Sequence, residues 1–430
     1  MPLLYDLAAG AYFLGIRAAA PFHGKARQWA AGRDGLWARL EAAAPRLQGC
    51  LWMHCASVGE FEQGRPVLEA LHAAQPQRPI LLTFFSPSGY EARKDHPLAT
   101  HVEYLPEDTA ANAQRLVKLV NPSAALFVKY EFWFHHLRTL QQQHVPTYLV
   151  SAVLRPDQPF FRWYGSTWRR MLQCYTHILA QDEATRALLA GLDFTNVTVS
   201  GDTRFDRVAA IMREGRALPL GQAYHRAMDA PVLIAGSSWP ADEDLLVQVL
   251  GRMRRPPRVV VVPHEPSEAA LQRAADRFPK PVERWSRLEA ELEAGRLAAT
   301  GHAPPDEDPL FARTLLVDRM GILARLYQHA DVAYVGGGFS DGIHSILEAA
   351  AWGRPVIFGP KHTKFPEAQA LIDAGAGFCV RDADELRTTL NRLFGDREYL
   401  AWCGEVARRF VQERTRATQR AVEVITGANS

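Results

Sequence analysis

The feature that most constrains the fold of this chain is a repeated alternation between short apolar runs and longer helix-like stretches. After residue 49, apolar runs typical of buried strands lie at residues 51–56, 80–85, 102–105, 124–128, 147–150, 178–180 and 197–200. Helix-like stretches separate these runs. Strands that alternate with helices in this way form a parallel sheet with helices on both faces. We therefore predict an α/β fold for the first half of the chain.

A second alternation follows a polar, helical connector at residues 206–224. Its strand-like runs lie at residues 232–235, 259–262, 315–317, 332–335 and 356–358, and a long helical stretch at 397–426 ends the pattern. A chain of 430 residues is long enough for two domains. We predict two Rossmann-like domains, at residues 26–225 and 226–430, with parallel sheets that face a central cleft. This arrangement suits an enzyme that holds one substrate in each domain.

Composition excludes several classes of protein. The hydrophobic fraction of 47% and the charged fraction of 22% are ordinary for a globular protein, and a net charge of +2 is too small to indicate a nucleic-acid partner. The five cysteines are scattered and contain no CxxC pair, and no His/Asp cluster has the spacing of a metal site. We therefore expect no metal and no disulfide framework, and a reducing, cytosolic environment.

The N-terminal segment at residues 3–22 is mostly apolar but contains Asp6 and Arg17. It is about long enough to span a bilayer, yet the two charges disfavour a simple transmembrane helix. A signal peptide is also disfavoured, because no convincing cleavage site follows a charged segment. We predict a membrane-associated helix at residues 1–25 that lies in the interface. A core helix of the first domain is the alternative.

The stretch YVGGGFSDGIHSILEAAAWGRPVIFGP at residues 334–360 predicts a strand, a glycine-rich loop, a helix at 343–352 and a second strand. Ligands of such units bind where strands end and helices begin, and glycines there allow close approach to the backbone. On a helix, His344 and Glu348 would share one face. A carboxylate there can accept hydrogen bonds from a ribose diol. A capped helix with a salt-bridged Glu348 explains the pattern equally well.

Two carboxylates follow strands of the first domain. Glu60 is predicted at the start of a helix after the strand 51–56, where the helix dipole would keep it ionised and lower its basicity. Glu131 follows the strand 124–128, at the same edge of the sheet. Two such groups indicate acid–base chemistry, although a helix-capping role explains Glu60 at least as well. Arg204 follows the last strand and could meet a phosphate or carboxylate, or pair with Asp202 or Asp206.

Other turns of both domains are candidate binding segments. The turn at residues 83–89 is rich in hydroxyl groups and suits a phosphate or a sugar, or a plain helix cap. The segment FFRWYGSTWRR at 160–170 mixes aromatics with arginines and suits a lipid interface, or core packing with a solvated basic face. In the second domain, turns at strand ends contain Ser237 and the pair His264 and Glu265, and residues 320–322 open another helix. None of these turns matches a GxGxxG or Walker A pattern.

Eight motifs together resemble one known family, the 3-deoxy-D-manno-octulosonic acid (Kdo) transferases of lipopolysaccharide assembly. The motifs are SVGEFEQ (57–63), LTFFSPSGYE (82–91), YLPEDT (104–109), KYEFW (129–133), GDTRFDRV (201–208), AGSSW (235–239), VVPHEP (261–266) and GGGFSDGIHSILEAAAWGRPVIFGP (336–360). The resemblance covers most of the chain. It implies the GT-B fold and transfer of Kdo from CMP-Kdo to the lipid A precursor, lipid IVA, at the cytoplasmic face of the inner membrane.

The resemblance also implies roles for individual residues. The general base would be Glu60, and the transition state would be stabilised by Glu131 and Arg204. The first domain would bind the acceptor and the second the nucleotide sugar, without a cofactor. The implied CMP-contacting residues are His264, Glu265, Met320, Gly321, Ile322, Ser345, Ile346, Leu347 and Glu348, and Ser237 lies in a neighbouring candidate phosphate turn.

Two other functions fit the same patterns. One is a GT-B transferase or epimerase that uses a UDP-sugar, because a helix start near Glu348 would serve either nucleotide. The other is a membrane-seated protein that binds a nucleotide sugar without turnover. Selective binding of CMP over UDP favours the Kdo transferase.

Overall fold

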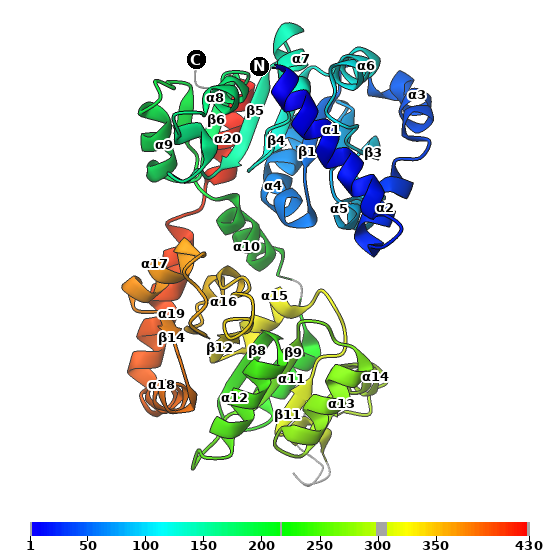
Figure 1. Ribbon diagram of the computed structural model, residues 1–430. Helices are drawn as coiled ribbons and strands as arrows, with labels where there is room; N and C mark the ends of the chain where they lie inside the picture. Colours follow the sequence, from blue (N-terminus) through cyan, green and yellow to red (C-terminus); the bar gives the residue numbers. More distant parts are fainter. Residues whose placement is uncertain (1, 216, 298–307, 428–430) are drawn as a thin grey trace. The chain divides into compact units, whose positions relative to one another are not determined.

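The computed structural model describes residues 2–215, 217–297 and 308–427, which form two compact units (Figure 1). The first unit comprises Met1–Asp206 and Thr415–Ser430, and the second comprises Arg207–Arg414. The boundary therefore differs from the expected one at 225/226, and the end of the chain returns to the first unit.

The expected helix at 397–426 is two helices, α19 (Arg397–Gln412) and α20 (Ala417–Thr426). Arg416 separates them in a left-handed conformation, with φ of 82°. Asp206 accepts hydrogen bonds from the backbone N–H groups of Arg416 at 2.6 Å and Thr418 at 2.7 Å. This carboxylate therefore caps α20 and holds it in the first unit.

The first unit is built on a seven-stranded parallel sheet with the order β3-β2-β1-β4-β5-β6-β7. All seven predicted strands are present, which confirms this part of the fold. They are β1 (Leu51–Cys55), β2 (Ile80–Phe84), β3 (His101–Tyr104), β4 (Ala124–Val128), β5 (Thr147–Ala152), β6 (His177–Ala180) and β7 (Val197–Val199).

Helices pack around this sheet, and every side chain of β1, β2, β4 and β5 is buried. Parallel strands covered on both faces need such continuous apolar runs. The helices are α1 (Pro2–Ala19), α2 (Gly24–Gly32), α3 (Leu36–Leu47), α4 (Val58–Ala74), α5 (Pro87–Arg93), α6 (Ala110–Val120), α7 (Phe134–Gln142), η1 (Pro159–Phe161), α8 (Ser166–Leu172), α9 (Glu183–Ala190) and α20. The helix α10 (Thr203–Glu214) contains the boundary between the units.

The second unit is also built on a seven-stranded parallel sheet, with the order β10-β11-β9-β8-β12-β13-β14. Its strands are β8 (Val232–Ser238), β9 (Arg258–Pro263), β10 (Val282–Arg284), β11 (Thr314–Leu316), β12 (Val332–Val335), β13 (Val356–Phe358) and β14 (Gly377–Cys379). The sequence predicts five of these seven. The other two, β10 and β14, are three-residue strands at the sheet edges and lack a buried apolar run.

The helices of the second unit are α11 (Pro219–Arg226), α12 (Pro240–Leu250), α13 (Glu268–Arg277), α14 (Trp285–Glu293), η2 (Pro309–Phe311), α15 (Leu323–Leu326), η3 (Tyr327–His329), α16 (Leu347–Ala351), α17 (Pro366–Ala374), α18 (Ala383–Gly395) and α19. The two sheets, their helices and their parallel strands establish the predicted pair of Rossmann-like units.

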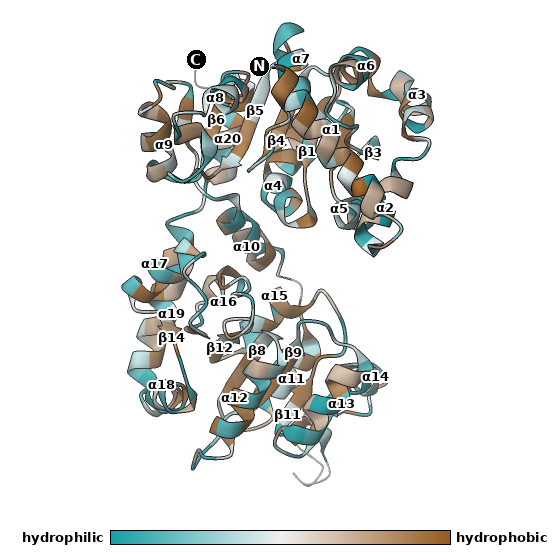
Figure 2. Ribbon diagram, viewed as in Figure 1, coloured by the Kyte–Doolittle hydropathy of each residue, from teal (hydrophilic) through white to brown (hydrophobic). Residues whose placement is uncertain are grey.

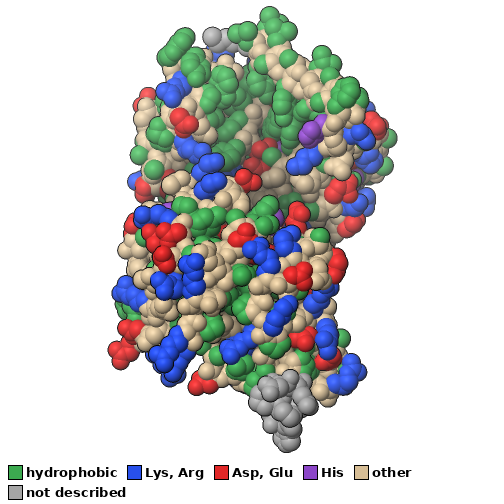
Figure 3. All heavy atoms as spheres, turned by 60° about the horizontal axis from the view of Figure 1, so that its bottom comes forward, with side chains coloured by type: hydrophobic (Ala, Val, Ile, Leu, Met, Phe, Trp, Pro, Cys, Tyr) green, Lys and Arg blue, Asp and Glu red, His purple; other side chains and the backbone are tan. Residues whose placement is uncertain are grey.

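The N-terminal helix α1 packs one face on the first unit and exposes the other. Phe13 is buried against Trp29 and Trp133, and Tyr5 Oη donates to Asp108 Oδ2 at 2.5 Å. Arg17 pairs with Glu107 at 2.7 Å, so this charge is held by the fold. Figure 2 shows the apolar character of α1, and in Figure 3 apolar side chains gather along the upper part of the first unit. One face of α1 therefore belongs to the core of the first unit, and the other face is exposed.

Within the described residues, no single helix is long and apolar enough to cross a bilayer. One pair of helices, Leu3–Ala19 and Gly24–Gly32, is together long and apolar enough to cross a bilayer. The chain bends by 113° between these two helices.

Candidate functional site

Glu60 lies just past the carboxyl end of β1, in the first turn of α4. The helix begins at Val58, two residues earlier than expected, so Glu60 is its third residue. Its Oε2 accepts a hydrogen bond from the backbone N–H of Ser57 at 3.1 Å. This is the capping contact that the sequence offered as the alternative. The side chain is nevertheless partly exposed, so capping leaves it accessible.

Glu131 lies past the end of β4, the strand next to β1, and is buried. Its Oε2 lies 2.7 Å from Nε2 of His54 and accepts a hydrogen bond from Nε1 of Trp133 at 2.7 Å. Its backbone carbonyl accepts a hydrogen bond from the buried Tyr175 hydroxyl at 2.5 Å. Both ends of this residue are therefore fixed by side chains of the first unit.

The structure brings the two carboxylates close enough to influence each other. Burial raises the pKa of Glu60, and the negative charge of Glu131 raises it further. The expectation that the helix dipole would lower the basicity of Glu60 is therefore wrong, because desolvation and like charge outweigh the dipole. A carboxylate with a raised pKa is a stronger base than an ordinary glutamate.

Arg204 lies in the first turn of α10, beyond β7. Its Nη2 pairs with Oδ2 of Asp202 at 2.6 Å, and its backbone N–H donates to the same carboxylate at 2.9 Å. The neighbouring Thr203 hydroxyl donates to the carbonyl of Gln63 on α4 at 2.5 Å. The salt bridge anticipated as the alternative is thus present, and the start of α10 is joined to the helix that carries Glu60.

The backbone is strained where these strands end. Lys129 and Ser151, which are not glycines, adopt left-handed conformations with φ of 69° and 56°. Ser237 does the same in the second unit, with φ of 51°. Such residues each destabilise a fold by about 1–3 kcal/mol and cluster at functional sites. This strain marks the carboxyl edges of both sheets as candidate sites.

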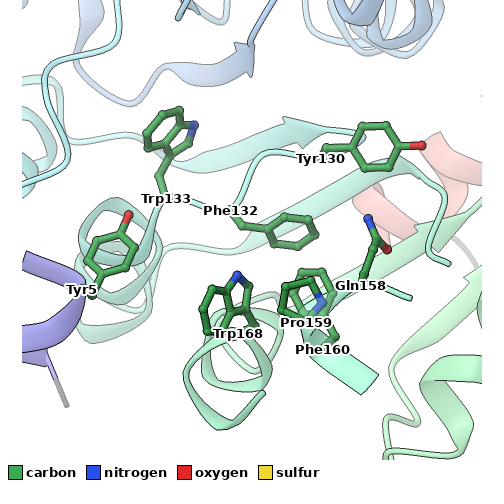
Figure 4. Close-up of a pocket in the computed structure, with 8 residues that line it drawn as sticks. All are labelled: Tyr5, Tyr130, Phe132, Trp133, Gln158, Pro159, Phe160 and Trp168. Atoms are coloured by element: carbon green, nitrogen blue, oxygen red, sulfur yellow. The ribbon is translucent and has the colours of Figure 1, made fainter. Parts of the chain in front are cut away.

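An aromatic pocket of about 360 Å³ opens beside Glu131 in the first unit (Figure 4). In the close-up, Trp168, Pro159 and Phe160 lie opposite Tyr5 and Trp133. The full lining is Tyr5, Tyr130, Phe132, Trp133, Gln158, Pro159, Phe160 and Trp168. Since the Trp133 indole also donates to Glu131, one wall of the pocket is part of the carboxylate site.

In the second unit, three aromatic rings stack at the carboxyl ends of β8, β9 and β12. The His264 ring lies 4.9 Å from the Trp239 ring and 4.4 Å from the His344 ring, measured between centroids. Nε1 of Trp239 donates to Nε2 of His344 at 3.1 Å. Burial and the neighbouring His264 lower the pKa of His344. Because its Nε2 accepts a hydrogen bond from Trp239, this ring acts as an acceptor. The partly exposed rings form a platform on which a flat base can stack.

Asp242 holds the backbone next to these rings in place, a role that the sequence analysis did not predict. It is fully buried and accepts from the Tyr334 hydroxyl at 2.9 Å. It also accepts from the backbone N–H groups of Gly337 at 2.9 Å and Trp239 at 3.0 Å. Trp239 belongs to the AGSSW motif of the sequence analysis but was assigned no role of its own, although an aromatic residue directly after a strand is a usable signal.

The three glycines after β12 serve protein packing. A Cβ on Gly336 would lie 2.3 Å from the carbonyl oxygen of Ser237, and one on Gly338 would lie 2.5 Å from the backbone N of Gly359. Gly337 has φ of 91° and is equally crowded. The loops at the ends of β8, β12 and β13 therefore pack backbone against backbone. This packing alone requires glycines, without a ligand.

The helix expected at 343–352 is much shorter. The helix α16 begins only at Leu347, and Ile343 and Ile346 are buried in a non-helical segment. His344 and Glu348 therefore do not share a helix face as predicted. Glu348 lies in the first turn of α16, where burial raises its pKa to about 7 and Arg207 partly opposes the shift.

The other residues assigned to the nucleotide vary in exposure. Ser345, Glu265 and Met320 are exposed, whereas Ile322, Ile346 and Leu347 are buried. Gly321 has φ of 84°, a conformation that favours glycine. The buried members can only contribute backbone atoms. Among the described residues, no set of three His, Cys, Asp or Glu side chains could hold a metal ion.

The raised pKa of Glu348 predicts a pH-dependent stability. An unfolded glutamate titrates near about 4.3, so the fold favours the protonated form, and stability falls as pH rises from there toward 7. Glu348→Gln removes this titration. Denaturant unfolding at pH 5 and pH 8 should show that the variant loses less stability than the wild type. An equal loss in both proteins would contradict the assignment.

Comparison with solved structures identifies the class of fold. The UDP-GlcNAc 2-epimerase from Neisseria meningitidis bound to UDP-GlcNAc is 14% identical, covers 88% of this chain and 99% of its own, and superposes with a TM-score of 0.59. The MurG of Acinetobacter baumannii is 13% identical, covers 88% and 99%, and gives a TM-score of 0.55. Two Rossmann-like units of this kind define the GT-B fold, as predicted.

Sequence comparison finds matches to one family. A family model described as 3-Deoxy-D-manno-octulosonic-acid transferase (kdotransferase) matches residues 33–207. The 3-deoxy-D-manno-octulosonic acid transferase of Bordetella pertussis is 27% identical over 97% of this chain and 98% of its own length. The transferase of the same name from Aquifex aeolicus is 26% identical over 80% and 86%. The protein is therefore a glycosyltransferase of GT-B fold. Its sequence is similar over nearly its whole length to a Kdo transferase, and residues 33–207 match the model of that family.

Proposed function

We propose that this protein is a Kdo transferase, which moves Kdo from CMP-Kdo onto a sugar hydroxyl of a lipid A precursor, lipid IVA, during lipopolysaccharide core assembly at the cytoplasmic face of the inner membrane. The observation that carries the proposal is the pair Glu60 and Glu131, which lies at the carboxyl edge of the first sheet beside the aromatic pocket. No step of the proposed reaction requires a cofactor.

The reaction is a single displacement. Glu60 takes the proton from the acceptor hydroxyl, and the hydroxyl oxygen forms a bond to the anomeric carbon of Kdo. The bond from that carbon to the CMP phosphate breaks, and CMP leaves with the electron pair, so the configuration inverts. Glu131 is held by His54, Trp133 and Tyr175 and orders the acceptor side. Arg204, which is already paired with Asp202, stabilises negative charge on the phosphate or the Kdo carboxylate.

The aromatic pocket and its surroundings support a lipid acceptor. Its apolar walls suit an acyl chain, and Trp133 places that chain next to Glu131. Trp163 is 92% exposed, and Arg162 and Arg170 lie on the exposed surface of the same segment. Exposed aromatics with nearby arginines suit an interface that contains anionic headgroups. The first unit thus serves as the acceptor-binding, membrane-facing part.

The outer face of α1 provides a membrane contact in this proposal. Leu3, Leu4, Leu7 and Leu14 are between 63% and 73% exposed, and Phe22 is 90% exposed. Because the inner face of the same helix packs on the first unit, the enzyme would lie on the membrane surface with α1 in the interface.

Substitution of the outer leucines tests this contact. Leu3→Gln, Leu4→Gln and Leu7→Gln together should abolish co-sedimentation with anionic vesicles, because each leucine contributes about 1.5–3 kcal/mol when fully buried. The melting temperature should stay near that of the wild type, since these side chains are exposed. The matched control is Met320→Gln with Trp402→Gln, two exposed apolar residues of the second unit. Unchanged co-sedimentation of the triple variant would place the membrane contact elsewhere.

The ring platform and Glu348 support a cytidine nucleotide in the second unit. A base can stack on Trp239 and His264, and Glu348 can accept hydrogen bonds from a ribose diol. Ligand-dependent melting tests the choice of nucleotide, because a bound ligand stabilises the folded state by RT ln(1+[L]/Kd). We expect CMP to raise the melting temperature and UDP to leave it unchanged at the same concentration. A selective response to UDP would instead indicate a UDP-sugar enzyme.

A further inference from the structure

The aromatic pocket of the first unit has a polar end. In Figure 4, Tyr130 and Gln158 lie at the right of the pocket, and Tyr5 and Trp133 lie at the left. At the left end the polar atoms already have protein partners, because the Tyr5 hydroxyl and the Trp133 indole each donate to a carboxylate of the protein. A polar part of a ligand would therefore find its partners at the other end.

Arg155 organises the two polar side chains at that end. Its backbone N–H donates to Oε1 of Gln158 at 2.8 Å, and its Nη2 donates to the hydroxyl oxygen of Tyr130 at 3.4 Å. The first contact fixes which way the Gln158 amide faces, since only the amide oxygen can accept. The second contact uses the Tyr130 oxygen as an acceptor, so the hydrogen of this hydroxyl remains for another partner.

The hydrogen-bonding groups that remain at this end are donors. They are the side-chain nitrogen of Gln158, the Tyr130 hydroxyl and the guanidinium of Arg155, and among the described residues no carboxylate pairs with this guanidinium. Lys129 adds a second positive charge, because its Nζ lies 5.2 Å from the centroid of the Tyr130 ring. Donors and positive charge together suit an anionic group such as a phosphate or a carboxylate.

The rest of the lining is apolar or aromatic. Phe132, Pro159, Phe160 and Trp168 form the remaining walls of this pocket of about 360 Å³. A free anion would leave these walls without contacts, and a plain hydrocarbon would leave the donors unpaired. The combination of a polar end and an apolar interior favours an amphiphile with an anionic group next to its chain.

We propose that the pocket binds the lipid acceptor by one acyl chain, and that Arg155, Tyr130 and Gln158 bind an anionic group next to that chain. The inference rests on the proposed function, which supplies a lipid as acceptor. Tyr130 and Phe132 line the pocket and flank Glu131 in the chain, so a lipid bound there is held beside this carboxylate. Arg155 is thus the residue that distinguishes an anionic lipid from a neutral one.

Calorimetry with short amphiphiles tests the site in the full-length protein without Kdo transfer. Decyl phosphate, kept below its micelle concentration, should bind the wild type, and decanol, which has the same chain and a neutral head, should bind more weakly. Arg155→Gln should weaken the binding of decyl phosphate by about tenfold, the size of one charge-assisted hydrogen bond, and leave that of decanol unchanged. Trp168→Ala removes an apolar wall and should weaken the binding of both amphiphiles.

Arg46→Gln is the matched control, because Arg46 is an exposed arginine of α3 that does not line the pocket. This variant should bind decyl phosphate as the wild type does. Since Arg155 is also exposed, the melting temperature of Arg155→Gln should stay near that of the wild type. An unchanged affinity of Arg155→Gln for decyl phosphate, or an equal loss for decyl phosphate and decanol, would overturn the proposal.

Competition in the transfer reaction identifies the occupant of the pocket. Decyl phosphate should inhibit competitively against lipid IVA, and Arg155→Gln should raise the KM for lipid IVA by about tenfold while kcat changes by less than about twofold. Inhibition that does not depend on the concentration of lipid IVA would mean that the pocket holds another lipid, and would contradict the proposal. If the wild type showed no Kdo transfer, the proposed function would fail, whereas calorimetry would still decide whether the pocket binds an anionic amphiphile.

Discussion

Replacing Glu60 by Gln is expected to lower kcat for Kdo transfer by about 10²–10⁴-fold, or about 3–5.5 kcal/mol in the barrier. A sugar hydroxyl is a poor nucleophile until a base removes its proton. Glu60 is partly exposed, lies at the carboxyl edge of the first sheet and has a pKa raised by burial and by Glu131. Gln keeps the size of the side chain and can still accept from the Ser57 N–H, so the helix cap survives.

The matched control is Glu62→Gln, which removes a carboxylate two residues later in the same helix. Glu62 pairs with Arg93 at 2.6 Å, so its loss perturbs a partly exposed ion pair and should leave kcat within about twofold. The wild-type rate should fall as pH decreases through the pKa of Glu60, above the ordinary glutamate value of about 4.3. Near-normal turnover of Glu60→Gln, with normal CMP binding, would assign the base to another residue, with Glu131 tested next.

The second large effect is expected from Asp242→Ala in the second unit. The substitution leaves the Tyr334 hydroxyl and the N–H groups of Gly337 and Trp239 without their acceptor. Each buried unsatisfied donor destabilises by about 1–3 kcal/mol, so the loss of all three hydrogen bonds should lower the free energy of unfolding by at least about 3 kcal/mol. CMP binding should weaken too, because Trp239 loses its anchor. Denaturant unfolding and calorimetry measure the two losses.

Asp242→Asn separates hydrogen bonding from charge at this position. Its amide oxygen can accept from the two backbone N–H groups while its NH₂ group donates to the Tyr334 hydroxyl. The variant should therefore lose less than about half of the stability that the alanine variant loses. Equal losses for the two variants would mean that the charge, and not the three hydrogen bonds, supports the loops.

The sequence predicts the sheets well because a strand buried on both faces must be apolar. All strands of the first sheet appear as such runs, and only the short edge strands β10 and β14 lack the signal. The boundary at Asp206 was missed for a different reason. It depends on the contact between Asp206 and α20, which lies more than two hundred residues away in the chain.

The candidate sites were predictable where a motif carried them. Glu60 and Glu131 follow neighbouring strands, and the structure brings them together. His54 and Asp242 support the two sites from buried positions, so local sequence gives no sign of their partners. The basicity of Glu60 was wrongly predicted because desolvation depends on tertiary packing, whereas the helix dipole can be inferred locally. The length of α16 was also wrongly predicted, because it too depends on tertiary packing. Ile343 and Ile346 are buried in a loop where the first turn of the helix was expected.

The proposed reaction is the transfer of Kdo from CMP-Kdo to a lipid A precursor. Mass spectrometry of the lipid product tests it most directly, with purified full-length protein, lipid IVA and a source of CMP-Kdo. We expect a product heavier than the acceptor by whole Kdo residues, formed by the wild type and nearly absent with Glu60→Gln. No product with CMP-Kdo, together with turnover of a UDP-sugar by the same preparation, would contradict it.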